Sequence, residues 1–174
     1  LAKLDQIYHS SMELSEPELV FNEIKKGEST NREFKQTFAL DVKLKERGGH
    51  IVNECVKTVA GFMNKSGGTL FIGVADNSEI TGIEVEVGKT KLHKSVDKYM
   101  NTIKDILKKR IGSASLSNCD FNPVKIRGKT ILKIECSQSD HEVFVENDFF
   151  VRMGPSTNKL EGRELATFIK DRFN

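Results

Sequence analysis

The most continuous apolar run in the chain lies near its middle, in the segment TLFIGV at residues 69–74. Apolar residues follow one another there with almost no alternation, which is typical of a strand covered on both faces. Gly67 and Gly68 form a turn into this run, and an acid, Asp76, follows two residues after its end. The pattern predicts a buried strand at the centre of a sheet.

Four other segments repeat apolar residues at intervals of three and four, which predicts amphipathic helices. They span residues 15–27, 50–64, 89–111 and 160–173. Ser15 is the expected N-cap of the first helix, Pro17 lies in its first turn, and Gly27 ends it. We expect the last helix to bury Leu165, Phe168, Ile169 and Phe173.

Most of the remaining apolar positions follow strand patterns. The predicted strands are residues 31–38, 80–85, 116–126, 130–136, 142–146 and 149–153. Strands 69–74 and 80–85 are expected to form a hairpin, and the last four to form two more, the final one turning at Asn147 and Asp148. Segment 41–49 is charged and ends in two glycines, which predicts a loop.

Together these elements predict a single α/β (α+β) domain with a mixed β-sheet flanked by helices. A length of 174 residues with 37% hydrophobic content suffices for one core. We assign residues 28–174 to this domain and residues 1–27 to an N-terminal arm with a short helix. Because the chain begins at Leu1 and not at Met, we expect a part of a longer protein. A further domain and a homo-oligomer both stay open.

Composition excludes several classes of protein. Cys55, Cys119 and Cys136 have no CxxC spacing, which argues against a zinc knuckle or disulfide framework and predicts a reducing, cytoplasmic setting. The sequence has no apolar run of about 18 residues, so no membrane partner is expected. The formal net charge of +2 does not indicate nucleic-acid binding by itself, so a basic surface must come from local clustering.

Asp76 has two interpretations. Ligand chemistry in α/β sheets collects just past the carboxyl ends of strands, which is where Asp76 lies. Alternatively, Asp76, Asn77 and Ser78 serve only to turn the chain toward Ile80.

Three blocks of sequence resemble the Schlafen AlbA_2 domain. They are ESTNREFK at residues 28–35, AGFMNKSGGTLFIGVAD at residues 60–76 and FFVRMGPST at residues 149–157. They match the family's ExxxxEFK pattern, its GV-x-D ending and its YVRxGxST pattern, in family order, and the similarity covers about residues 22–173. The loop at residues 41–49 departs from the family.

This resemblance implies a metal-dependent endoribonuclease acting on structured RNA such as tRNA. The family's metal-binding and catalytic acids correspond to Glu28, Glu33 and Asp76 of this chain. Many microbial relatives are described only as putative DNA-binding domains. The resemblance therefore favours RNA as the partner and leaves DNA open.

The chemistry of these residues is compatible with that role. Three carboxylates converging on one end of the sheet would suit Mg²⁺ or Mn²⁺, which prefer oxygen ligands and can activate a nucleophile. Lys35, two residues after Glu33, is expected on the same face of its strand, where it could steady a phosphate as a further catalytic residue. Three acids within 49 residues are also common in chains without any such site.

Basic residues provide a second candidate surface. Lys91, Lys94 and Lys98 have helical neighbour spacing and would form a ridge that binds phosphates without sequence preference. The alternative is an ordinary solvated helix face. Arg152 is expected either to clamp a phosphate or to pair with a buried acid.

Two functions from different classes follow. The first is the endoribonuclease, favoured because a pure binding surface gains nothing from an acidic cluster beside phosphates. The second is a catalytically silent DNA- or RNA-binding module of a larger regulatory or defence protein. A domain that binds other proteins is a third interpretation.

Overall fold

The computed structural model describes residues 14–88 and 91–174. The helices in this part of the chain are α2 (Glu16–Lys25), α3 (Gly49–Asn64), α4 (Val96–Ile111), α5 (Ser113–Leu116) and α6 (Gly162–Phe173). The strands are β1 (Arg32–Lys35), β2 (Leu40–Asp41), β3 (Glu46–Arg47), β4 (Gly68–Ile72), β5 (Cys119–Ile126), β6 (Lys129–Cys136), β7 (Phe144–Val145), β8 (Asp148–Met153) and β9 (Ser156–Leu160). None of the described helices is long and apolar enough to cross a membrane.

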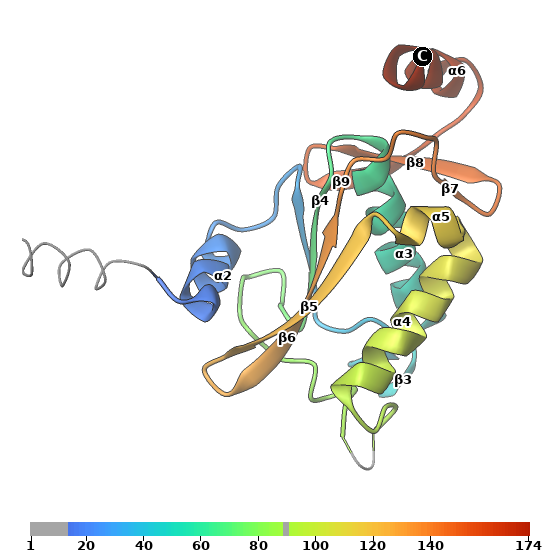
Figure 1. Cartoon of the computed structure of the whole chain (residues 1–174). Coiled ribbons are helices and arrows are strands. Elements are labelled where there is room, and N and C mark those ends of the chain that lie inside the picture. The colour runs from blue at the N-terminus through green and yellow to red at the C-terminus, as the bar shows by residue number, and fades with distance from the viewer. Residues whose placement is uncertain (1–13, 89–90) are drawn as a thin grey trace, which may run out of the picture.

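A four-stranded mixed sheet in the order β1-β4-β6-β5 forms the centre of the molecule (Figure 1). Strand β4 pairs in parallel with β1 and antiparallel with β6, and β5 closes the sheet as the hairpin partner of β6. The prediction that the apolar run forms a central strand is confirmed. A separate three-stranded sheet, β7-β8-β9, packs against α3, and α6 lies beyond it at one end of the molecule (Figure 1).

Both faces of β4 are covered, which explains its unbroken apolar sequence. Leu70 and Ile72 join the core that α3 and α4 form on one face, whereas Phe71 joins a second core on the opposite face. Val20 and Ile24 of α2 belong to this second core. Helix α2 of the predicted arm is thus packed on the sheet, and residues 1–13 of that arm lie outside the described residues.

Helix α4 is shorter than predicted. It begins at Val96, with Ser95 as N-cap accepting from Lys98 N, and the predicted start at residue 89 lies outside the described residues. The apolar periodicity therefore extended into a segment that is not helical.

The predicted strand 80–85 does not form, and its predicted hairpin with the central strand is reduced to one antiparallel bridge, between Val74 and Ile80. Thr81 N and Gly82 N both donate to Gly73 O, at 2.8 and 2.9 Å, so the chain folds tightly back on the end of β4. Gly82 has a φ of 80°, in the left-handed region that glycine tolerates. A Cβ on Gly73 would lie 3.0 Å from Gly82 C, so the two glycines permit this close approach.

Several boundaries also differ. The predicted loop at 41–49 contains the short hairpin β2–β3, strand β1 ends at Lys35, and α5 precedes β5. The turn between β7 and β8 lies at Glu146 and Asn147, one residue earlier than expected. Residues 156–160 form strand β9, which was not predicted, and α6 begins at Gly162, two residues later than expected, with its apolar residues only partly buried.

Candidate nucleic-acid site

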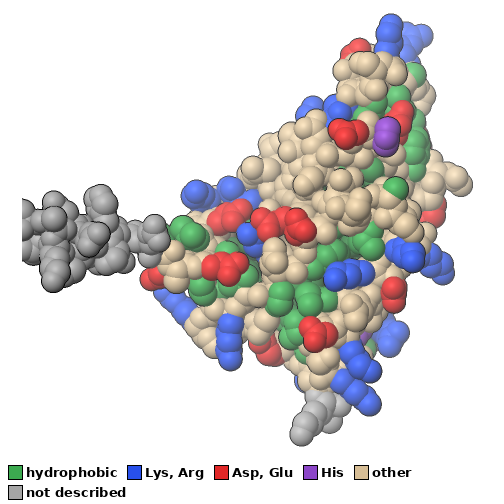
Figure 2. All heavy atoms as spheres, viewed as in Figure 1, with side chains coloured by type: hydrophobic (Ala, Val, Ile, Leu, Met, Phe, Trp, Pro, Cys, Tyr) green, Lys and Arg blue, Asp and Glu red, His purple; other side chains and the backbone are tan. Residues whose placement is uncertain are grey.

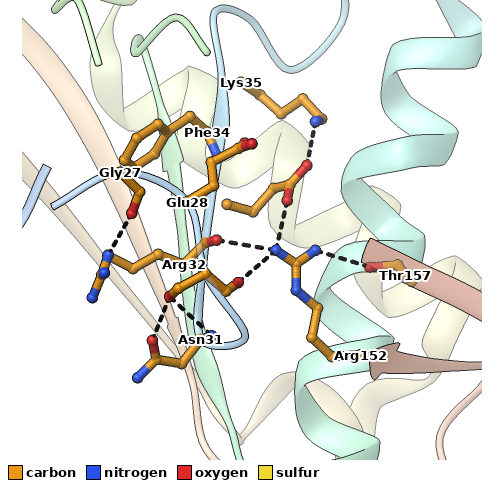
Figure 3. Close-up of polar contacts among 10 residues, drawn as sticks. Gly27, Glu28, Asn31, Arg32, Phe34, Lys35, Arg152 and Thr157 are labelled. Atoms are coloured by element: carbon orange, nitrogen blue, oxygen red, sulfur yellow. Dashed lines mark hydrogen bonds and ion pairs between the residues drawn. The ribbon is translucent and has the colours of Figure 1, made fainter. Parts of the chain in front are cut away.

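Glu28 and Glu33 lie at the base of a tight turn that leads into β1. Ser29 and Arg32 pair across this turn, with Ser29 N donating to Arg32 O at 3.0 Å. Continuing this antiparallel pairing sets residue 28 opposite residue 33. Glu28 Oε1 also accepts from Phe34 N at 3.0 Å (Figure 3). The spacing of the two glutamates is therefore set by the length of this turn.

Glu33 is 9% exposed, and two cations compensate the charge of its carboxylate. Its Oε1 accepts from Lys35 Nζ at 2.5 Å, and its Oε2 lies 2.8 Å from Arg152 Nη2 (Figure 3). The second contact is an ion pair without an aligned hydrogen bond, since Glu33 Oε2 has no hydrogen-bond partner among the described residues. Burial alone lowers the pKa of Lys35, but the hydrogen bond and the charge of Glu33 outweigh it and raise that pKa. Lys35 thus carries its charge at neutral pH.

Arg152 ties this turn to the rest of the molecule. Its Nη2 donates to Ser29 O at 2.8 Å and to Arg32 O at 3.0 Å, and its Nη1 donates to Thr157 Oγ1 at 3.2 Å. The guanidinium also lies 5.0 Å from the centroid of the Phe62 ring. Arg152 is only 1% exposed, so the nucleic-acid contact predicted for it has to be corrected. The structure shows the alternative, a pair with a buried acid.

The block AGFMNKSGG brings α3 and β4 to the same junction. A Cβ on Gly61 would lie 3.0 Å from Thr157 Cγ2, and one on Gly68 would lie 2.4 Å from the Phe62 ring. The fully buried Asn64 donates from Nδ2 to two carbonyls of the C-terminal segment, each at 2.8 Å. All three sequence blocks therefore meet around one arginine, which explains why they occur together.

Asp76 lies four residues beyond the end of β4 and is exposed. The turn that follows is closed by Ser78 N donating to Ala75 O at 2.8 Å and by Glu79 N donating to Asn77 Oδ1 at 3.0 Å. Asn77, and not Asp76, is thus the side chain that stabilises this turn.

Lys35 and Asp76 line a common hollow of about 600 Å³ at the carboxyl ends of the parallel strands β1 and β4. Lys43 and His50 line it too, whereas Glu28 and Glu33 do not. Across residues 14–88 and 91–174, no group of three or more His, Cys, Asp or Glu side chains is placed to hold a metal ion. The expected convergence of three carboxylates is therefore not present in this arrangement.

The predicted basic ridge is also rearranged. Lys91 and Lys94 precede α4, and only Lys98 lies within it. All three side chains are exposed, as a phosphate-binding role requires. They do not share a helix face, because the helix begins later than predicted.

Glu86 is a buried polar residue that the sequence analysis did not identify. It is 0% exposed, and its carboxylate accepts from Phe38 N, Ala39 N and Tyr99 OH, at 2.9, 2.8 and 2.5 Å. Burial, followed by the charge of Glu86, raises the pKa of Tyr99 well above its ordinary value. Its neighbours in sequence are polar and apolar in equal measure, so no local pattern distinguished Glu86 from a surface acid.

Comparison with protein families matches residues 28–161 to the Schlafen AlbA_2 domain. No curated protein matches the chain. Among solved structures, the DIP2311 protein from Corynebacterium diphtheriae is 17% identical with a TM-score of 0.58, over 83% of this chain and 24% of that one. This likeness shows the fold alone, and the present chain spans about a quarter of that protein. Since the family match covers well over half of the residues and includes all three blocks, the chain belongs to the Schlafen AlbA_2 family.

Proposed function

We propose that this chain is a nucleic-acid-binding domain with a preference for RNA over DNA. Membership of the AlbA_2 family supports a nucleic-acid-related role. The observation that carries the proposal is the hollow at the carboxyl ends of β1 and β4, which Lys35 and Asp76 share. Lys43 and His50 on its wall would supply further positive charge or hydrogen-bond donors to a phosphate, although Asp41 and Glu79 line the same wall and Asp41 lies 3.4 Å from His50 Nε2.

The second candidate is endoribonuclease activity that depends on Mg²⁺ or Mn²⁺, with structured RNA such as tRNA as substrate. It is favoured by the position of Asp76, which lies exposed in the hollow and is not needed to close its own turn. An acid beside a phosphate-binding wall weakens plain binding, so its presence there points to chemistry.

The carboxylates have the right donor type for a hard divalent cation but not the arrangement. Glu33 is already paired with Lys35 and Arg152, and Asp76 lies in a hollow that neither Glu28 nor Glu33 lines. Lys35 would hold the scissile phosphate from the wall of the hollow, with its ammonium charged at neutral pH.

The test is to incubate the purified chain with labelled tRNA or single-stranded DNA, in Mn²⁺ or in EDTA. We expect RNA to bind in both conditions and to be cleaved only with Mn²⁺. The variant Asp76→Asn tests the role of Asp76 in cleavage. It should bind RNA as well as the parent or better, while its cleavage rate falls by about 100-fold or more. Its melting temperature without metal should not decrease.

Each result assigns one function. Binding with no cleavage in Mn²⁺ would identify a catalytically silent module. Absence of binding to both nucleic acids would overturn the proposal. An Asp76→Asn variant that is destabilised but still cuts RNA in its folded fraction would remove Asp76 from the chemistry.

A further inference from the structure

Two cations lie against one aromatic ring on the side of α2 that meets the β5–β6 turn. Arg127 Cζ is 4.3 Å and Lys25 Nζ is 5.2 Å from the centroid of the Phe21 ring. Neither cation forms an ion pair with another described residue, and both are exposed. In this region, apolar side chains are visible between charged ones (Figure 2).

Two hollows adjoin this ring. One of about 620 Å³ and one of about 290 Å³ share Phe21, Ile126 and Arg127 in their walls. The smaller hollow also contains Lys25 and reaches Glu79, which lines the hollow that holds Lys35 and Asp76 as well. The three hollows thus form a series that leads from the Phe21 ring to the candidate site.

We propose that Phe21, Arg127 and Lys25 form a subsite for single-stranded nucleic acid, and this rests on the function proposed above. A base stacks on the platform of Phe21 and Arg127, and Lys25 and Lys129 contact the flanking phosphates. Aromatic and guanidinium groups stack on any base, and cations beside them bind the backbone. The subsite holds the strand that continues into the hollow of Asp76.

The packing of α2 does not require this arrangement. Val20 and Ile24 bury the helix on the sheet, whereas Phe21 remains partly exposed. Arg127 has a φ of 50° in a two-residue hairpin turn, where Asn or Gly is preferred. Glu18 lines the larger hollow and Glu79 lines the smaller one. The positive charge is therefore concentrated at the Phe21 ring and not spread over the walls of both hollows.

A tryptophan reporter tests stacking directly, because the natural chain contains no tryptophan. In Phe21→Trp, we expect fluorescence to be quenched as single-stranded RNA is added, with affinity close to that of the parent. Phe168→Trp, at the other end of the molecule in α6, should bind RNA equally and show no quenching.

Affinity measurements give an independent readout. We expect Arg127→Ala and Phe21→Leu to weaken RNA binding by about 5- to 150-fold, the range typical for the loss of one base–aromatic stacking contact. Phe21→Leu keeps an apolar side chain against the core, so its melting temperature should stay close to that of the parent. Arg163→Ala, a matched loss of an exposed arginine on α6, should leave affinity unchanged.

The outcomes separate the two proposals. If the parent binds RNA but Phe21→Trp is not quenched and Arg127→Ala binds normally, the subsite is overturned and the proposed function stands. If the parent binds neither RNA nor single-stranded DNA, both are overturned.

Discussion

At the residue scale, Arg152 contributes structure and not direct recognition. It is buried, offsets the charge of Glu33, and holds both carbonyls of the turn that carries the family's glutamates. Its place in the Schlafen pattern is therefore explained by the position it gives to Glu28 and Glu33. A buried arginine such as Arg152 can affect nucleic-acid binding only through the residues that it positions.

Replacing Arg152 by Met should destabilise the fold by about 3–5 kcal/mol, because the buried charge of Glu33 would lose a partner. Adding Glu33→Gln to this variant should recover part of the loss, since the uncompensated charge is then removed. Denaturant unfolding of the parent, both single variants and the double variant measures the coupling. Strictly additive losses would show that the pair contributes nothing beyond packing.

His93 makes stability depend on pH. Burial lowers the pKa of His93 and outweighs the opposing charge of Glu86, and its ring packs on Tyr99 at 5.1 Å. The unfolded chain, with an ordinary histidine pKa of about 6.5, binds this proton more readily than the folded one. Stability is therefore full above about pH 6.5 and decreases as the pH falls below it. Melting temperatures at pH 7 and pH 5 should differ less in His93→Gln than in the parent, and an equal difference would contradict this assignment.

At the element scale, the β5–β6 hairpin places two cysteines opposite each other. Cys119 pairs with Cys136, and Ser137 N donates to Asn118 O at 2.8 Å, which makes the cysteines a non-hydrogen-bonded pair. In such pairs the Cα atoms are about 4.5 Å apart, within the range for a disulfide. A hydrogen bond with the Cys119 thiol and burial both raise the pKa of Cys136.

Excess glutathione disulfide at pH 8.5 should therefore oxidise this pair, with the two thiols losing two protons and two electrons as the reagent is reduced to two thiols. Peptide mass spectrometry should find Cys119 linked to Cys136 and Cys55 still reduced, because Cys55 is fully buried. A disulfide that closes the loop between Cys119 and Cys136 should raise the free energy of unfolding by up to about 3 kcal/mol. Cys119→Ser provides the control, and mixed disulfides at both positions without a link would contradict the expected geometry.

At the scale of the whole molecule, the positive charges lie in separate places. Lys35 and Lys43 line the hollow at the sheet, Lys25 and Arg127 flank Phe21, and Lys91, Lys94 and Lys98 lie at the start of α4. A net charge of +2 conceals this distribution, because the chain has 25 acidic residues beside its 27 basic ones, and some of the acids line the same hollows.

Changing Lys91, Lys94 and Lys98 together to Glu should weaken RNA binding and make its salt dependence shallower. The slope of log affinity against log salt decreases by roughly 0.7–0.9 for every phosphate that the variant no longer neutralises. The fold should be kept, since all three side chains are exposed. Titrations at several salt concentrations measure the slope, and a slope equal to that of the parent would identify these lysines as an ordinary solvated surface.

Local sequence determined the elements that depend on continuous patterns. The apolar run before Asp76 required a strand covered on both faces, and Ser15 is the N-cap that was expected, where the structure adds a capping box with Glu18. The three family blocks likewise indicated the fold. In these segments the spacing of apolar residues and the capping contacts each involve only a few consecutive residues. Neighbours in sequence are therefore sufficient to determine the secondary structure.

Tertiary structure decided what depends on partners far apart in the chain. Arg152 became a buried junction because Glu33, Ser29 and Thr157 surround it, and segment 80–85 lost its strand pattern to the close approach of Gly73 and Gly82. Asp76 lines the hollow beyond the end of β4 and Glu33 does not, because the strand pairing sets Glu33 beside Leu70, two residues before β4 ends. Burial, charge compensation and backbone approach are set by residues that meet only after folding, and for that reason the chemistry of the site could not be derived from spacing alone.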